Sequence, residues 1–433
     1  MIRTYVRADL KLDGSWHIGS WDSDAANILG TLKDHKENPV VPSSGIAGML
    51  RAAFGDSATG LLGRDPDDAT KDDAREISPW WILGTVTTVE PPENTPAVAT
   101  RRRTRIDRRR KASARHGLFD TEEVSGGKVT VYFRADNVDP KPFLKLLAAC
   151  NPRIGGGRTI GLGAAELTGI RHRTIEFGDG NDEETKKAFL EFLMPHSSPI
   201  ERVEKLLEKG ENYEFTNPSR TPLLTANMTV DRLAITDRQE THIHGSTMKG
   251  ILRSRVEFIG RSMGYAVCGA RDEDTGDWTG CGECAVCVVF GYSGKPGKLE
   301  FATAKWTSDQ QDSEPKERVR IAIDRFTGGT RSGAWFKQQY LENVTWKLEI
   351  FGSLPAEDDP NGWIRAALLH ALRDINDGFV TIGPEGATGY GRAQVRKIKL
   401  EGAEVNFSEI PAVLKPSEDA AQNLSVNAME AMT

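Results

Sequence analysis

The stretch His242–Phe258, HIHGSTMKGILRSRVEF, decides the fold of the chain around it. It predicts a helix entered through Gly245-Ser246-Thr247, where a hydroxyl side chain can accept from the free N–H groups of the first turn. The apolar side chains at helical spacing are Met248, Ile251 and Leu252, and the cations off that stripe are Lys249, Arg253 and Arg255. The pattern indicates an amphipathic helix with a cationic flank and an N-terminus suited to binding an anion.

The same design occurs earlier, in Ser43–Gly55, SSGIAGMLRAAFG. Ser43 or Ser44 is the expected cap, and Arg51 lies beside the apolar stripe. The apolar set at helical spacing is Ile46, Met49, Leu50 and Ala53. Two helices of one design predict an internal duplication.

Two further pairs of segments repeat in the same order. Thr104–Phe119, TRIDRRRKASARHGLF, matches Val319–Phe336, VRIAIDRFTGGTRSGAWF, and each is followed by apolar alternation typical of a strand. The Gly-rich segment GGGRTIGLGAAEL from Gly155 matches IGPEGATGYGRAQV from Ile382. The repeat is far longer than a solenoid unit, so it predicts two fused copies of one domain.

The first copy has the order strand, helix, strand, strand, helix, Gly-rich loop, strand. That order favours an α+β fold of two tandem ferredoxin-like domains, similar in shape to RNA-recognition domains. We place the first domain at 1–172, a helical connector at 173–221 and the second domain at 222–413. An insertion at about 260–300 holds four cysteines, and 414–433 is expected to be a disordered tail.

Bulk properties narrow the class of protein. A chain of 433 residues suffices for two or three domains with their own cores. No stretch reaches the length of a membrane span, and alternating Ile2–Leu12 predicts a strand where a signal peptide would lie. The expected location is therefore cytoplasmic. The net charge is −6, so any nucleic-acid partner must be bound by a local patch.

Four of the five cysteines are clustered, as Cys268, Cys281, Cys284 and Cys287. Four thiolates at short spacing suit a tetrahedral structural Zn²⁺, because a catalytic zinc keeps one position open. An iron–sulfur cluster is the alternative, since thiolate tetrads hold those too. Cys150 lies on an apolar helical face and is expected in the core.

The ordered motifs resemble those of the RAMP superfamily of CRISPR-associated proteins, specifically the backbone subunits of type III effector complexes. The resemblance rests on the Ser-Gly-rich entry to an Arg-bearing helix, the Ile-Asp-Arg segments, the Gly-rich loops ending at Gly163 and Gly391, and the four-cysteine insertion. It covers both halves but neither the connector nor the tail. A two-copy fusion is similar to the fused subunits of type III-D systems.

The resemblance implies a protein that binds guide CRISPR RNA, presents it to complementary target RNA and assembles with other CRISPR effector subunits. In the family, helix N-termini and nearby cations hold guide phosphates, and a thumb hairpin intrudes between guide and target. The residues implied for RNA binding are Ser43, Ser44, Arg51, Arg103, Arg105, Arg108, Arg158, Ser246, Thr247, Lys249, Arg253 and Arg325. Nine Arg or Lys residues lie between Arg101 and Arg115, although a solvated loop has the same composition.

Some family members cut target RNA with a loop Asp and a divalent metal, which here would be Mg²⁺ or Mn²⁺. The implied catalytic candidates are Asp24 and Asp34 in the first copy and Asp237 in the second. Other side chains near these loops are Asp22, Glu37, Glu240, His35, His242 and His244. Exposed carboxylates without a catalytic role remain the alternative for each loop.

Three hypotheses follow. The protein is a guide-binding subunit that also cleaves target RNA, or the same subunit without cleavage, or a guide-processing ribonuclease of the same superfamily. A zinc-stabilised protein-interaction module that binds no RNA belongs to a different class, and the basic run disfavours it. No G-x-x-x-x-G-K-[ST] motif occurs, so the sequence does not indicate nucleotide hydrolysis.

Overall fold

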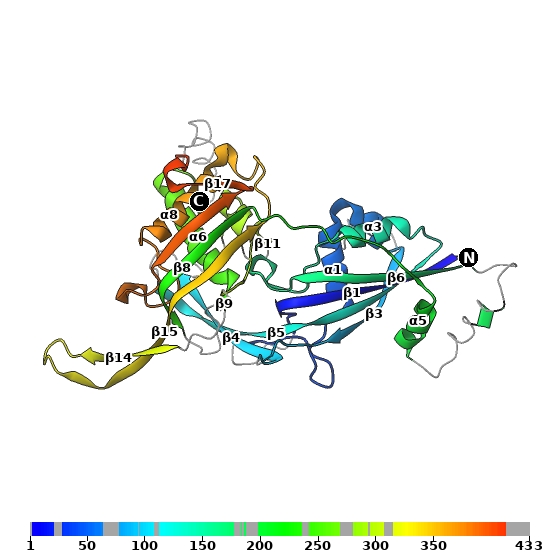
Figure 1. Cartoon of the computed structure of the whole chain (residues 1–433), viewed down its shortest axis with the longest axis horizontal. Coiled ribbons are helices and arrows are strands. Elements are labelled where there is room, and N and C mark those ends of the chain that lie inside the picture. The colour runs from blue at the N-terminus through cyan, green and yellow to red at the C-terminus, as the bar shows by residue number, and fades with distance from the viewer. Residues whose placement is uncertain are drawn as a thin grey trace, which may run out of the picture. The chain divides into compact units, whose positions relative to one another are not determined.

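The computed structural model shows a mixed α+β protein (Figure 1). It describes residues 2–20, 28–63, 78–93, 95–107, 112–176, 183, 186–187, 198–235, 242–268, 280–292, 295–306 and 315–412. Two compact units form, the first from most of residues 1–219 and the second from Arg220 onward together with Thr159–Gly161. None of the described helices combines the length and apolar character that a membrane crossing requires.

The first unit is built on a sheet whose central strand is β1. Its elements, with η for 3-10 helices, are β1 Ile2–Trp16, β2 Ile28–Leu29, α1 Ser43–Phe54, η1 Gly55–Ser57, α2 Ala58–Leu62, β3 Trp80–Thr88, β4 Val98–Asp107, β5 Ala112–Asp136, α3 Lys141–Ala149, η3 Arg158–Ile160, β6 Ala165–Glu176, α5 Pro199–Glu208 and β7 Glu211–Asn212. Of η3, Arg158 belongs to the first unit, whereas Thr159 and Ile160 belong to the second. Strand β1 pairs antiparallel with β5 and β6, and β3 pairs antiparallel with the far side of β5. The order across the sheet is therefore β6-β1-β5-β3.

The second unit repeats this arrangement around β8. Its elements are β8 Leu224–Ile235, β9 His242–Ile243, α6 Gly245–Ser262, α7 Ala285–Phe290, β10 Gly291–Tyr292, β11 Lys295–Pro296, β12 Glu300–Phe301, β13 Ala304–Lys305, β14 Lys316–Ile323, β15 Thr330–Phe351, η5 Pro360–Gly362, α8 Trp363–Asn376, η6 Gly386–Thr388, β16 Ala393–Leu400, β17 Ala403–Val405 and η7 Phe407–Glu409. Strand β8 lies between β15 and β16, and β12 pairs with β15, so the order is β16-β8-β15-β12.

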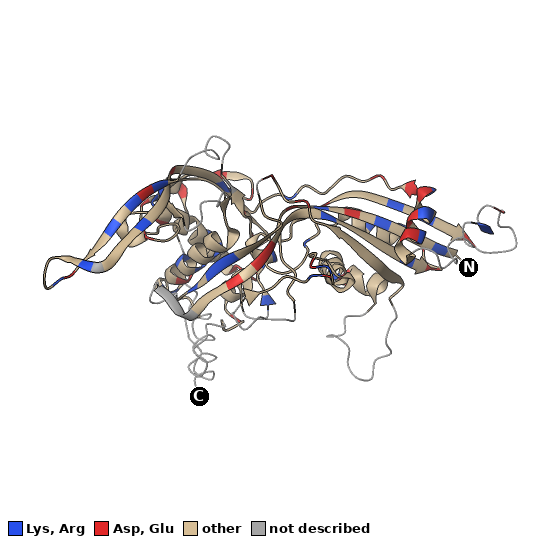
Figure 2. Cartoon of the chain, turned by 90° about the horizontal axis from the view of Figure 1, so that it is seen from below, with Lys and Arg blue, Asp and Glu red and all other residues tan. Residues whose placement is uncertain are grey.

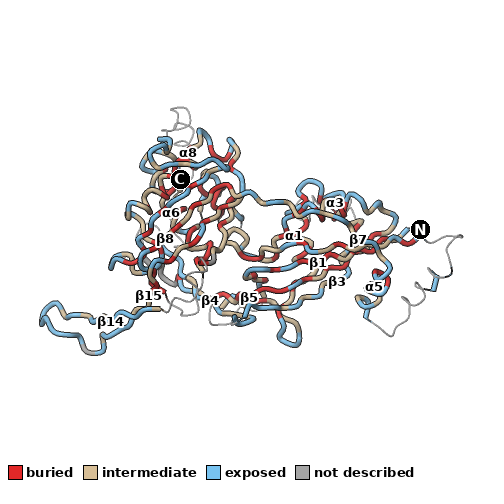
Figure 3. Tube along the Cα trace, in the orientation of Figure 1, coloured by how far each residue is buried: buried red, intermediate tan, exposed pale blue. Residues whose placement is uncertain are grey.

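Period-two alternation creates each core. In the first unit, buried side chains from alternate positions of β1 and β5 pack with the apolar faces of α1 and α3. In the second unit, Met248, Leu252 and Val256 of α6 pack with α8 and with the buried side of β8 and β15. The buried segments follow these sheets and helices, whereas the β14–β15 hairpin is largely exposed around its tip (Figure 3).

Helix α5 covers the opposite face of the first sheet. Its buried Val203, Leu206 and Leu207 contact Tyr5 and Tyr132 in a separate apolar cluster. Ser198 caps the helix in a capping box with Glu201. The sequence predicts a helix here as part of a connector, and the structure packs it onto the first unit.

The two Gly-rich loops close in the same way. Ile154 N–H donates to Gly163 O and Ile382 N–H donates to Gly391 O, both at 2.8 Å. Both glycines have positive φ, and a Cβ at Gly163 would lie 1.8 Å from Ile154 O. Backbone closure therefore requires the last glycine of the Gly-X-Gly triplet in both units.

Candidate nucleic-acid interface and cysteine site

Helices α1 and α6 each begin earlier than the sequence predicts. Pro42 and His244 occupy the N-cap positions, and neither helix has a side-chain cap hydrogen bond. The prediction that Ser43, Ser44, Ser246 or Thr247 caps its helix is wrong, because the carbonyls of Pro42 and His244 already accept the first helical bonds. The four hydroxyl residues lie in the first turn instead. Ala53, expected on the apolar stripe, is exposed, and Phe54 is buried in its place.

Lys249 lies in the first turns of α6 and is partly buried. Its ammonium donates to Thr159 Oγ1 at 2.7 Å, within the second unit. Burial, and then repulsion from Arg253, lowers the pKa of Lys249 to about 8. A buried ammonium beside the N-terminus of a helix favours an anionic ligand.

Other predicted cations are held by the protein itself. The Arg51 guanidinium donates to Leu62 O at 2.8 Å and ties α1 to the end of α2. Arg103 donates to Glu123 Oε1 at 2.5 Å, and the Glu123 side chain is only 4 % exposed. The structure thus gives Arg51 and Arg103 structural partners that the sequence did not indicate.

The β14–β15 hairpin carries a dense set of exposed side chains. Phe326 at its tip is fully exposed and Trp335 is 61 % exposed. The Asp324 carboxylate accepts from the N–H groups of Phe326 and Thr327, which fixes the turn and lowers the pKa of Asp324. The hairpin therefore presents aromatic faces to solvent from a defined turn.

Lys and Arg residues occur along both strands of the hairpin (Figure 2). Arg318, Arg325 and Arg331 are exposed on the hairpin. Nearer the sheet, Arg320 pairs with Glu385 of the second Gly-rich loop and donates to Thr388 Oγ1 at 3.1 Å. Exposed aromatic rings next to Arg side chains are the combination that binds single-stranded nucleic acid by stacking and charge.

The corresponding β4–β5 hairpin of the first unit is described up to Asp107 on one strand and from Ala112 on the other. Ile106 and Leu118 are exposed on it, Arg105 is exposed, and Arg102 pairs with Asp120 at 3.1 Å. Arg108 lies outside the described residues. Arg158 is partly exposed in η3, on the first Gly-rich loop.

Among the predicted catalytic residues, only Asp34 is described. Its Oδ1 accepts from the N–H groups of Lys36 and Asn38, and its Oδ2 accepts from the Asn38 side chain. The backbone N–H of Asn38 is the main cause of the lowered pKa of Asp34. Asp34 therefore shapes a turn. Asp22, Asp24, Asp237 and Glu240 lie outside the described residues.

The remaining side chains near these loops do not form a compact acid–base cluster within the described residues. His35 is exposed, and Glu37 has φ of 64° in the Asp34 turn. His242 and His244 contact each other edge to face at 4.3 Å between ring centroids, at the entry to α6.

A polar cluster that sequence reasoning missed lies at the base of the first loop. His17 Nδ1 donates to Glu122 O at 2.8 Å, and the Glu122 carboxylate accepts from Thr31 N–H at 3.0 Å. Lys33 pairs with the same carboxylate at 3.4 Å. The residues come from the end of β1, the loop and β5, so no local sequence pattern could reveal them. The cluster thus links His17 with Thr31 and Lys33, which lie on the two sides of Asp22 and Asp24 in the sequence.

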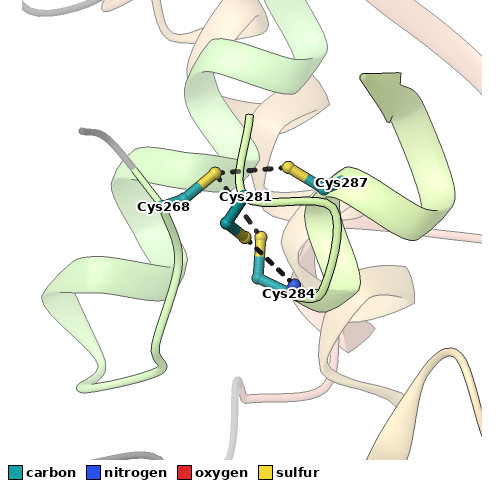
Figure 4. A group of neighbouring side chains, drawn as sticks. All are labelled: Cys268, Cys281, Cys284 and Cys287. Atoms are coloured by element: carbon teal, nitrogen blue, oxygen red, sulfur yellow. Dashed lines mark hydrogen bonds between the residues drawn. The ribbon is translucent and has the colours of Figure 1, made fainter. Parts of the chain in front are cut away.

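The four clustered cysteines converge, as Figure 4 shows. Their Sγ atoms all lie within 4.8 Å of one another, with Cys268 and Cys284 at 3.7 Å and Cys268 and Cys287 at 3.2 Å. A tetrahedral zinc with bonds of about 2.3 Å to sulfur places its ligands about 3.8 Å apart, close to the separation of Cys268 and Cys284. The set can hold a metal ion. Hydrogen bonds from Cys268 and Cys284 hold the pKa of Cys287 far below its usual range.

Comparison with known proteins identifies relatives of this chain. The RAMP superfamily is matched over residues 9–166 and 219–394, one match in each half. The chain is also similar to "CRISPR system Cms endoribonuclease Csm3" of Methanocaldococcus jannaschii, with 24 % identity over 194 residues. That similarity covers 42 % of this chain and 74 % of the relative.

Proposed function

This chain belongs to the RAMP superfamily, and we propose that it is a backbone subunit of a type III CRISPR ribonucleoprotein. It binds guide CRISPR RNA, presents that RNA to complementary target RNA and assembles with other effector subunits. The main support is that the two units have the same strand order and that each bears a long hairpin. The β14–β15 hairpin exposes aromatic and Arg side chains. The similarity to a protein named as a CRISPR endoribonuclease supports it.

We propose further that the halves are two tandem ferredoxin-like domains, 1–172 and 222–413, joined by 173–221. The sheet orders β6-β1-β5-β3 and β16-β8-β15-β12 support this assignment, because a ferredoxin-like sheet has its first strand between the last and the third. Helices α1 and α3 pack on one face of the first sheet, and α6 and α8 pack on one face of the second.

Guide phosphates are proposed to bind at the first turns of α1 and α6 and along the hairpins. The first-turn hydroxyls of Ser43, Ser44, Ser246 and Thr247 and the partly buried ammonium of Lys249 support contacts at the helices. The exposed Arg325 supports a contact on the second hairpin. Arg105, Arg108 and Arg158 remain predicted contacts, whereas Arg51, Arg103 and Arg253 act in this proposal mainly through their internal partners.

Cleavage of target RNA is proposed for Asp24 and Asp237, with Mg²⁺ or Mn²⁺ as the cofactor. The turn hydrogen bonds of Asp34 support a structural role for that residue. The test compares target products of the assembled complex with Asp24→Ala, Asp237→Ala and Asp34→Ala. We expect loss of one product for each of the first two variants and unchanged product lengths for the third. Unchanged products in all three variants would make the protein a non-catalytic guide-RNA scaffold.

The cysteine set is proposed to hold a structural Zn²⁺. Four sulfur ligands leave no open position for substrate, so the ion would stabilise the fold rather than take part in cleavage. Metal analysis of the purified protein distinguishes one zinc per chain from iron with inorganic sulfide.

The deciding experiment for the whole proposal is to purify the protein from its host and sequence the RNA that accompanies it. Guide sequences with a common repeat-derived end are expected. Unrelated RNA or none contradicts the proposal, and cleavage of precursor RNA by the isolated protein would favour a guide-processing ribonuclease instead.

A further inference from the structure

Arg253 joins α6 to the cysteine segment, residues 280–291 of the second unit, through one guanidinium group. Its Nε donates to Glu257 Oε1 at 2.9 Å, its Nη1 donates to Gly291 O at 2.5 Å, and its Nη2 approaches Cys287 Sγ at 3.6 Å. The first partner lies on α6 itself, whereas the other two lie on α7 and directly after it. A group that acts only in RNA binding would not need these partners.

The Arg253 pair with Glu257 is well buried. The Glu257 side chain is 1 % exposed and that of Arg253 is 14 % exposed. The carboxylate lies one helical turn along α6 and fixes the orientation of the planar guanidinium. The Nη2 edge is thereby directed at the sulfur of a predicted metal ligand.

Four thiolates around Zn²⁺ carry a net charge of −2, so a cation and an N–H donor next to one sulfur stabilise the occupied site. Cys287 is the fully buried member of the set. A cysteine sulfur that water cannot reach depends on donors from the protein for its hydrogen bonds. Arg253 supplies one such donor.

We propose that Arg253 is a positioning residue of the cysteine site, which stabilises the Cys287 thiolate and fixes the cysteine segment against α6. The inference rests on the proposed zinc occupancy. It changes the role given to Arg253 by the sequence, from an RNA contact to a link between the metal site and the helix that carries Lys249. Metal loss is then expected to loosen α6 as well as the cysteine segment.

The test measures zinc affinity by chelator competition in Arg253→Met and Arg253→Lys, with Arg255→Met as the matched control. Arg255 lies on the same helix and pairs with Asp374 at 2.6 Å, with side chains of the two residues 19 % and 13 % exposed. The control thus loses an ion pair of similar burial. We expect Arg253→Met to lower zinc affinity about 10–100-fold, Arg253→Lys to lower it less, and Arg255→Met to leave it unchanged.

A spectroscopic readout separates the sulfur interaction from a general loss of stability. With Co²⁺ in place of zinc, the thiolate-to-metal charge-transfer band is expected to move to lower energy in Arg253→Met and to stay in place in Arg255→Met. If Arg253→Met does not fold, Arg253→Lys is judged by the same two measurements. Affinity and spectrum equal to those of Arg255→Met overturn the inference. A wild-type protein that binds no zinc would instead refute the proposed occupancy.

Discussion

Raising the pH from about 7 to about 9.5 should stabilise the second unit by about 2 kcal/mol through Lys249 alone. Burial lowers the pKa of this lysine from 10.5 to about 8. That difference corresponds to about 3 kcal/mol between fully protonated and fully deprotonated conditions, and about two thirds of it is recovered by pH 9.5. The magnitude is large relative to the stability of a typical domain.

The sign follows from proton binding. Above about pH 8 the folded protein releases the Lys249 proton, whereas the unfolded chain keeps it until about pH 10.5. The unfolded state then binds more protons, so the free energy of unfolding rises with pH through this window.

The assay is urea unfolding of the wild type, Lys249→Met and Lys399→Met at several pH values, followed by tryptophan fluorescence. The pH-dependent gain should vanish in Lys249→Met and persist in Lys399→Met, because Lys399 is exposed on β16. Titration of the cysteines is common to all three proteins and cancels in the comparison. Equal pH dependence in all three would refute the reasoning.

Three further predictions concern the cysteine site, the first hairpin and RNA binding. Gly280→Ala should destabilise the second unit by about 1–2 kcal/mol in thermal unfolding, because Gly280 has φ of 81° and a Cβ would lie 2.9 Å from Cys287 Sγ. Gly250→Ala, in open space on α6, should not destabilise it. Glu123→Ala should lower the free energy of unfolding of the first unit by about 3 kcal/mol in urea, because it leaves the Arg103 guanidinium, 16 % exposed, without its carboxylate. Glu90→Ala, which breaks the exposed pair of Glu90 with Lys128, is the control. A smaller loss for Glu123→Ala than for Glu90→Ala would contradict the prediction. Replacing Arg325 and Arg331 with Gln should reduce the slope of log affinity against log salt concentration for single-stranded RNA by about 0.7 for each phosphate that is no longer neutralised. The control is Lys399→Gln. If both proteins give the same slope, Arg325 and Arg331 do not contact the RNA.

Much of the fold could be predicted from local periodicity and from the duplication. The apolar positions of β1, α1, β8 and α6 recur at spacings that only a strand or a helix can bury, and those elements lie close to the expected bounds. The cysteine spacing likewise predicted a group that the structure brings together. In each of these features the residues are close together in the sequence, so the chain connectivity alone keeps them near one another.

The partners of charged side chains could not be predicted in this way. Arg51, Arg103 and Arg253 all look like free cations in the sequence, yet the structure gives each an internal acceptor. The bond from His17, which follows β1, to Glu122 of β5 joins residues that are far apart in the sequence. The N-caps could not be predicted either. Ser43 and Ser246 have side chains that can cap a helix, but each helix begins earlier, with Pro42 and His244 at the N-cap positions.

The sequence by itself determined the two copies, the alternation that builds each sheet and the set of four thiols, because each depends on spacing along the chain. Only the tertiary structure decided which cations are used internally and which remain for a ligand. The physical reason is that a guanidinium or ammonium binds whichever carboxylate or carbonyl the folded chain places within about 3 Å, and that distance is set by packing between distant segments.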